Sequence, residues 1–391
     1  MTKARDLADF LGDNTSLNTI NNAYAAGTLV PSSTNPSLII NGAMEVAQRG
    51  TTSTSDEYQT VDRFRTSNGG LDEAVTQEHH TLTSSDTGVW ELGFRHSYKQ
   101  TNGNQTSGAG TSDRVTIQHR IEGQDIATSG WDYTSSSSDV TLSFWCKSSV
   151  AQNFYARLQS YGGTQQNYAM ETGSLTANTW TKITKTIPGA SAVSFDNDNT
   201  LGALLEITLF RGTNTTGTRT LNVWEPYDTN VRVPDMDSTW YTTNDATFEI
   251  TGVKLEVGSE ATDFQHTSYG DELAACQRYF FTPAPRGFQH GYIGPITSAT
   301  SSVAISLITY PVAMRSAPSL EITGPSDDTY RYRSNNGSIN ANSNTNPAIG
   351  NTTTYNCRLD WTGFSGLTAN TSGIVTQGNG TDGYFGFTAE L

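Results

Sequence analysis

The chain has 391 residues, of which 16% are charged and 35% apolar, and Thr, Ser, Asn and Gly, which favour turns and strands over helices, make up much of the rest. The aromatic content of 10% excludes a largely disordered chain, and the length suffices for two or three all-β domains. The net charge of −15 disfavours binding to nucleic acid or to an anionic membrane surface.

The first predicted element is a helix over residues 2–11. Its apolar stripe consists of Ala4, Leu7, Ala8 and Leu11. A helix this short is not stable alone in water, so it has to dock onto a protein surface. Residues 12–36 have the composition of a spacer, which favours attachment to another protein over docking onto the helix's own domain.

Alternating apolar and polar residues predict antiparallel strands further along the chain. The clearest segments are 115–121, 140–147, 154–161 and 205–209. Each has one apolar and one polar face, as the strands of a two-sheet sandwich require. Their short, regular spacing predicts a jelly-roll β-sandwich.

A strand followed by a helix is predicted over residues 248–281. The alternation of the strand shifts at Gly252, which indicates a β-bulge. Ser268 and Asp271 then have the spacing of a capping box, so a helix is expected to begin there and to continue until Pro283 stops it.

This predicted helix carries an apolar stripe at heptad-like steps. The stripe consists of Tyr269, Leu273, Cys276 and Phe280. It could be buried around the axis of a homotrimer or against the chain's own sandwich, and the pattern allows both.

A second, smaller β domain is predicted after Pro283, with strands around 303–307 and 355–361. Residues 334–354 are almost entirely small and polar, and we expect a long loop there. The predicted division is 1–36 for the helix and linker, 37–267 for the jelly roll, 268–282 for the linking helix and 283–391 for the C-terminal β domain.

The cysteines and the apolar runs indicate where the chain is made. Cys146, Cys276 and Cys357 have no metal-type spacing and are odd in number, so we expect buried, reduced thiols in a protein made in a reducing cytosol. No apolar run is long enough to span a membrane, and the sequence shows no secretory signal.

Two groups of residues carry a family resemblance. Residues 248–279 contain F-x-I-x-G-V-x-L-E-V-G, A-T-x-F-x-H and S-Y-G-x-E-L-x-x-C-Q-R-Y, and residues 38–64 contain L-I-I-N-G-A-M, Q-R-G and V-D-R-F. Over about 230 residues the chain resembles a module of bacteriophage tail fibres and minor tail proteins. The resemblance implies a carbohydrate-binding-like jelly roll, a homotrimer and a place in the virion tail, with the N-terminal stripe contacting another virion protein.

No catalytic residue is predicted. The sequence contains no G-x-S-x-G, H-E-x-x-H or phosphate-loop motif, and its six histidines are scattered. We therefore expect a protein that is not an enzyme, although paired carboxylates for glycoside hydrolysis have no sequence signature that would reveal them.

Residues 196–200, D-N-D-N-T, offer hard oxygen ligands. Leu201 and Ile207 stand where an EF-hand loop needs its sixth and twelfth residues, so an Asx-rich turn is favoured. We predict no cofactor, with a structural calcium ion as the alternative.

The predicted glycan-binding residues lie on the polar faces of two strands. They are Trp145, Tyr155, Arg157, Gln159 and Tyr161. Sugar rings stack on aromatic side chains, and sugar hydroxyls bond to amide and charged groups, so these side chains would form one patch if strands 140–147 and 154–161 pair. The alternative is that a loop or a neighbouring subunit covers this face.

Together these observations predict a non-catalytic phage receptor-binding protein that adheres to a host surface polysaccharide. A purely structural virion protein, such as a head fibre or a tail adaptor, is the first alternative. A polysaccharide depolymerase is the second.

Overall fold

The computed structural model describes residues 36–284, 291–323, 330–334, 339–343, 345–378 and 384–391. The predicted N-terminal helix and nearly all of its linker lie outside these residues. Residues 262–265 contain no helix or strand. None of the helices in the described ranges is long and apolar enough to cross a bilayer.

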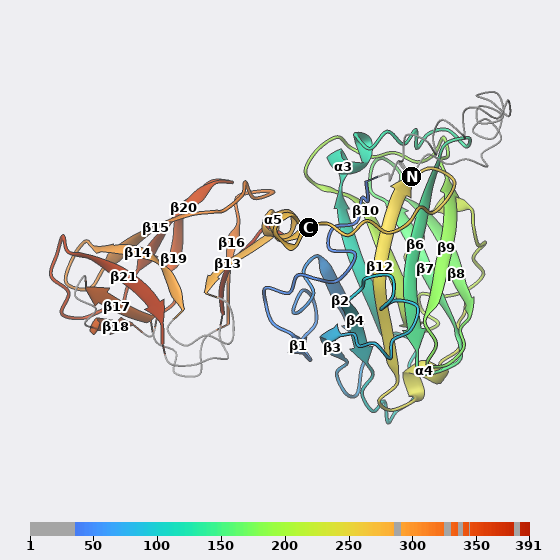
Figure 1. The fold of residues 1–391 in the computed structure, drawn as a ribbon, viewed down its shortest axis with the longest axis horizontal. Coiled ribbons are helices and arrows are strands. Elements are labelled where there is room, and N and C mark those ends of the chain that lie inside the picture. The colour runs from blue at the N-terminus through green and yellow to red at the C-terminus, as the bar shows by residue number, and fades with distance from the viewer. Residues whose placement is uncertain (1–35, 285–290, 324–329, 335–338, 344, 379–383) are drawn as a thin grey trace, which may run out of the picture. The chain divides into compact units, whose positions relative to one another are not determined.

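Two six-stranded antiparallel sheets form a β-sandwich (Figure 1). The β12 sheet contains, in spatial order, β1 (Thr52–Ser53), β3 (Thr76–Thr81), β4 (His96–Thr101), β12 (Thr247–Val257), β6 (Asp139–Ser148) and β9 (Thr181–Pro188). The β10 sheet contains β11 (Trp224–Pro226), β8 (Gln166–Ser174), β7 (Asn153–Ser160), β10 (Leu201–Arg211), β5 (Arg114–Glu122) and β2 (Phe64–Gly69). The short helices α3 (Gly123–Ala127) and α4 (Thr239–Thr242) belong to connections.

The predicted alternation builds the core of this sandwich. Apolar side chains of β6, β7, β10 and β12 belong to one buried cluster, and the rings of Phe154 and Phe248 meet across the two sheets with centroids 4.9 Å apart. The predicted all-β sandwich is therefore confirmed. The three cysteines are buried and free, as expected.

The predicted bulge in β12 is also confirmed. The register shifts between Thr251 and Lys254, and Gly252 has a φ of +62°. A Cβ atom at Gly252 would lie 2.6 Å from Cζ of Phe94. Both the backbone conformation and the close ring explain why glycine occupies this position.

Helix α5 (Tyr269–Gln277) begins as predicted but ends early. The Ser268 hydroxyl accepts the N–H of Asp271 at 3.2 Å. Phe280 lies in β13 (Phe280–Ala284), so the expected continuation to Pro283 is wrong. Pairing with β22 (Tyr384–Thr388) supplies the backbone hydrogen bonds of this segment, and Pro283 lies where the β13 register is irregular.

The predicted apolar stripe of this helix is divided in the structure. Cys276 and Phe280 are fully buried within the chain, whereas Tyr269 is 60% exposed and Leu273 is half-buried. The four side chains therefore do not form one exposed heptad seam. The homotrimer itself stays a prediction.

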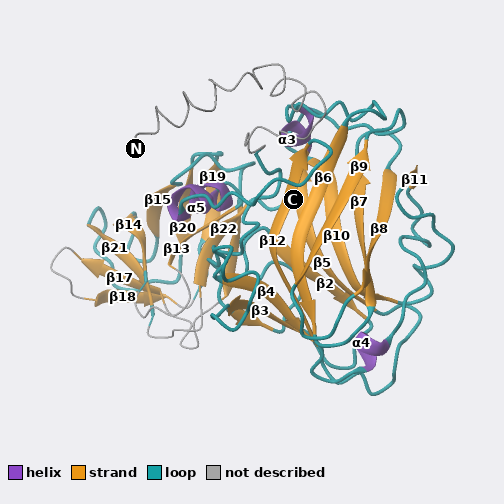
Figure 2. Ribbon diagram, turned by 45° about the vertical axis from the view of Figure 1, so that its right-hand side comes forward, coloured by secondary structure: helices purple, strands orange, loops and turns teal. Residues whose placement is uncertain are grey.

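The C-terminal strands form two further sheets (Figure 2). The β22 sheet contains β13, β22 (Tyr384–Thr388) and β16 (Ser319–Thr323). The β14 sheet contains β18 (Ile339–Ser343), β17 (Tyr330–Ser334), β21 (Ser372–Gln377), β14 (Tyr292–Ser298), β15 (Ala304–Thr309), β20 (Asn356–Trp361) and β19 (Ala348–Thr352). Side chains from both sheets share a second core.

The expectation of one long loop over 334–354 is wrong, because β18 and β19 lie within it. They pair with β17 and β20, and this pairing satisfies the backbone of a segment whose small polar side chains show no strand periodicity.

Candidate functional site

The five predicted glycan-binding residues are divided between the two faces of the sandwich. Trp145 lies on the outer face of β6, in the β12 sheet, and Tyr155, Arg157 and Gln159 lie on the outer face of β7, in the β10 sheet. Tyr161 follows β7 and is half-buried. The two strands do not pair, because β6 pairs with β12 and β9, and β7 pairs with β10 and β8, so the condition for a single patch is not met. The connection between them crosses from one sheet to the other.

The outer face of the β10 sheet is polar but buried. Glu206 is fully buried and accepts hydrogen bonds from Nε and Nη2 of Arg157, both at 3.0 Å, and from Nε and Nη2 of Arg211 at 3.1 and 3.0 Å. Gln118 adds a bond at 2.9 Å. Burial alone would raise the pKa of Glu206, but the two guanidinium groups outweigh it and hold that pKa well below its ordinary range.

The segment that follows β10 covers this face. The ring of Tyr227 lies 5.7 Å from Cζ of Arg157, and the amide of Asn167 donates to the carbonyl of Arg232 at 3.0 Å. Arg157 and Gln159 are therefore almost fully buried, which matches the alternative that a loop covers them.

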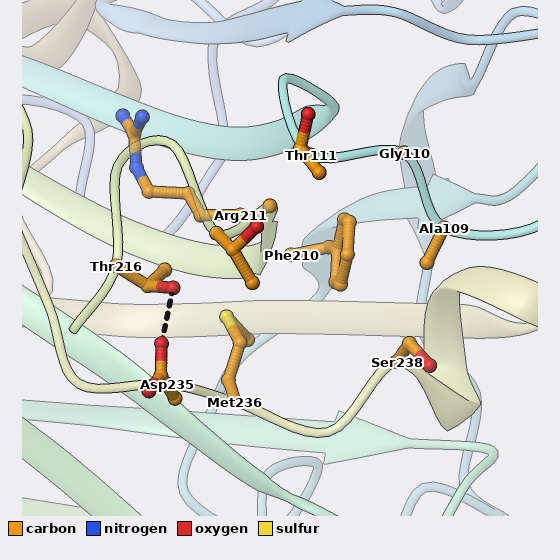
Figure 3. A pocket seen from close by; sticks show the side chains of 11 residues that line it. Ala109, Gly110, Thr111, Phe210, Arg211, Thr216, Asp235, Met236 and Ser238 are labelled. Atoms are coloured by element: carbon orange, nitrogen blue, oxygen red, sulfur yellow. Dashed lines mark hydrogen bonds between the residues drawn. The ribbon is translucent and has the colours of Figure 1, made fainter.

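An opening remains at the end of this face, beside α4. A cavity of about 240 Å³ is lined by residues 109–111 and 210–213, and by Thr216, Asp235, Met236 and Ser238. Figure 3 shows Phe210 and Met236 beside this space, with the guanidinium of Arg211 pointing away from both. The hydroxyl of Thr216 donates to Asp235 Oδ1 at 2.6 Å and orients that carboxylate (Figure 3).

A second cavity of about 240 Å³ shares part of this lining. It is lined by Asn153, Tyr155, Asp235, Met236 and Asp237. The hydroxyl of Tyr155 makes a long hydrogen bond of 3.5 Å to the carbonyl of Asp235. Because both cavities are lined by Asp235 and Met236, a chain-like ligand could occupy them together.

The surroundings of the second cavity are acidic. Burial raises the pKa of Tyr155, and the carboxylates of Glu171, Asp237 and Asp235 raise it further. The described lining contains two carboxylates and neither Lys nor Arg. An aromatic ring, a thioether, an amide and two carboxylates can hold the apolar face and the hydroxyl groups of a sugar ring.

Sequence reasoning identified only Tyr155 of this lining. The segment 235–238 has no alternation, so a search for strand faces passes over it. A usable signal was the dense mixture of aromatic and acidic residues in W-E-P-Y-D-T-N-V-R-V-P-D-M-D-S-T-W, residues 224–240, within a turn-rich connection.

Trp145 has different surroundings on the other sheet. It is half-buried, and the nearby Trp180 donates its indole N–H to Asp86 at 3.1 Å. The amino group of Lys147 lies 4.8 Å from the Trp180 ring centroid and 2.9 Å from Asp86. These contacts hold loop residues onto the β12 sheet.

In the predicted Asx-rich turn, the Asp198 carboxylate makes hydrogen bonds within the turn itself. Asp198 Oδ1 accepts the backbone N–H of Thr200 at 2.9 Å and its hydroxyl at 2.7 Å. No group of three or more His, Cys, Asp or Glu side chains suited to a metal ion occurs among the described residues.

The residues that carry the family resemblance contact one another and the C-terminal sheets. Cζ of Arg63 lies 3.4 Å from the Tyr279 ring centroid, and Cζ of Arg49 lies 3.6 Å from that of Phe280. Nε of Arg49 also donates to Glu321 at 2.8 Å. These motif residues therefore have structural roles, separate from the two cavities.

Structural comparison finds similar proteins at low sequence identity. A putative sugar-binding protein from Bacteroides thetaiotaomicron matches 57% of this chain and 100% of its own, with 11% identity and a TM-score of 0.32. The enzymatically active domain of tailspike protein 4 from bacteriophage CBA120 matches 57% of this chain, with 8% identity and a TM-score of 0.29. The baseplate tripod of bacteriophage Tuc2009 matches 61%, with 12% identity and a TM-score of 0.28.

This chain covers 21% of the tailspike chain and 60% of the tripod chain. No protein-family model matches the sequence, and no curated protein matches it.

Proposed function

We propose that the protein is a non-catalytic receptor-binding protein of a phage tail fibre, and that it binds a host surface glycan in the two cavities beside Asp235 and Met236. The observation that carries the glycan site is the lining shared by these cavities. The sequence motifs support the place in the virion tail, with residues 1–36 attaching the chain to another virion protein.

The chemistry of the cavities favours a sugar over a purely apolar ligand. Half-buried Met236 and the edges of the largely buried Phe210 and Tyr155 rings offer apolar surface, and Asp235 and Asp237, both exposed, offer acceptors for hydroxyl groups. Hydrogen bonds from sugar hydroxyls to carboxylates are charge-assisted, so they add both affinity and orientation.

Glycan-array binding, followed by calorimetry with the best polysaccharide, tests this site. Asp237→Asn and Met236→Ala should each weaken binding at least about tenfold, the effect of losing one charge-assisted hydrogen bond or one apolar contact. Asp228→Asn is the matched control, because Asp228 is exposed in the same connection but does not line either cavity. Unchanged affinity in both cavity variants would refute the proposed site.

One observation also supports the depolymerase alternative, since Asp235 and Asp237 line the same cavity. Two carboxylates can act as acid and base on a glycosidic bond. Incubating the protein with the bound polysaccharide and measuring new reducing ends separates the two functions. Release of product that is abolished by Asp235→Asn would identify an enzyme, and neither binding nor release would identify a structural protein.

A further inference from the structure

The exposed face of the β14 sheet carries a straight row of side chains. Ile374 lies opposite Arg333 on one side and Pro295 on the other, and Leu307 lies opposite Arg358. The register of β14 and β15 places Leu307 beside Pro295. The row therefore crosses five neighbouring strands, with three apolar residues in the middle and an arginine at each end, over about 19 Å at the usual strand spacing.

This row faces away from the core of the C-terminal sheets. Its neighbours along the strands, such as Ile296, Val375 and Leu359, are buried, so the alternation turns the row outward. Leu307 is 63% exposed and Ile374 is 36% exposed. Apolar side chains grouped on one surface indicate a contact with another molecule.

The composition of the row favours a protein partner over a glycan. Its centre is aliphatic and contains no aromatic ring on which a sugar could stack. An uncharged apolar centre bordered by arginines is typical of protein–protein interfaces, in which arginine is enriched.

The distribution of charge along the chain indicates which protein binds this row. Residues 37–282 carry 29 acidic and 16 basic side chains, a net charge of −13, whereas residues 283–391 carry 6 acidic and 5 basic, a net charge of −1. The sandwich of a second copy therefore carries the charge opposite to that of the arginines of the row, of which Arg358 also pairs with Asp360 of its own strand at 2.8 Å. Face-to-face packing of two such rows would instead bring arginines together.

We propose that the face formed by Arg333, Ile374, Pro295, Leu307 and Arg358 docks onto the acidic sandwich of a second copy of this chain. The contact is heterologous, because two different surfaces meet, so repeating it gives a ring of identical subunits where the rotation between copies closes and an open filament where it does not. This proposal does not depend on the glycan site.

Sedimentation equilibrium from about 1 to about 100 μM, the range of weak to moderate association, tests it on the full chain. The wild type should sediment as more than one copy, and raising the salt concentration should weaken the assembly. Leu307→Asp combined with Ile374→Asp should raise the dissociation constant at least tenfold with little change in Tm, because both positions are exposed. Arg333→Glu with Arg358→Glu should do the same.

Ser302→Asp is the control, since Ser302 is exposed in the turn between β14 and β15 and belongs neither to the row nor to the sandwich, and it should leave a folded assembly. A wild type that is monomeric at 100 μM would overturn the proposal. So would an apolar double variant that assembles like the wild type. Glycan binding is measured on the same variants, and its loss without a change in assembly would assign the face to a glycan and likewise overturn the proposal.

Discussion

Replacing Glu206 with Gln tests whether the buried ion cluster holds the β10 sheet together. The substitution keeps the shape of the side chain and removes its charge. Arg157 and Arg211, both about 2% exposed, would then lie buried without a counter-ion. Their bonds to Glu206 at 3.0 Å would become weaker contacts to a neutral amide, one end of which cannot accept a hydrogen bond.

The expected loss of unfolding free energy is about 3–5 kcal/mol, as for other buried ion pairs from which one partner is removed. Asp360→Asn is the control. Asp360 pairs with Arg358 at 2.8 Å, and the two side chains are 29% and 47% exposed, so the loss of unfolding free energy should be below about 1 kcal/mol. Replacing Arg157, Glu206 and Arg211 together with Met, Leu and Met should restore most of the stability, because no charge then remains buried.

Urea unfolding at pH 7, followed by tryptophan fluorescence, measures these differences through the midpoint and the slope. A loss of unfolding free energy below about 1 kcal/mol for Glu206→Gln would contradict this expectation, because it would mean that water or structural relaxation solvates the buried arginines. The pH dependence gives a second check. Because the folded-state pKa of Glu206 is lowered, its contribution is complete above the unfolded pKa of about 4.5 and is lost as the pH falls below it. Glu206→Gln should therefore flatten the acid side of the stability profile.

Three further changes have defined outcomes. Ser268→Ala removes the cap of α5 and should cost about 1 kcal/mol, seen as faster amide exchange in that helix. Gly252→Ala places a methyl group against the Phe94 ring at a φ of +62° and should lower the free energy of unfolding by about 1–3 kcal/mol in urea. Burial, with the stacked ring of His96, lowers the pKa of His79 to about 4, so the stability should fall as the pH drops from about 6.5 towards 4. His79→Gln should remove that part of the pH dependence of the urea midpoint.

The features that the sequence predicts well are local. The alternation of 140–147 and 154–161, the bulge at Gly252 and the cap at Ser268 each depend on residues close together in the chain. They are therefore visible without knowing which strands pair.

The features that the sequence does not predict depend on strand pairing and on cover by distant segments. Trp145 and Tyr155 would belong to one patch only if β6 and β7 shared a sheet. The alternation of apolar and polar residues within a strand is the same whichever sheet the strand joins, so it does not reveal the pairing. The sequences of β18 and β19 show no alternation of apolar and polar residues, so they do not predict strands. Pairing with β17 and β20 supports both strands. The cavities beside Asp235 exist because a non-periodic segment crosses the end of a sheet.

The positions that carry the family resemblance explain how a binding site can change while the fold is kept. Asn41 donates its backbone N–H to the Glu272 carboxylate, and Arg63 stacks on Tyr279, so motif residues more than 200 positions apart support one another. The proposed site uses other residues, 235–238 among them, in a connection between strands. Substitutions in such a connection change few buried contacts, whereas substitutions of the motif arginines leave buried charges without partners. If the proposed site binds a glycan, recognition of a different glycan would therefore require changes mainly in that connection, with the motif contacts left in place.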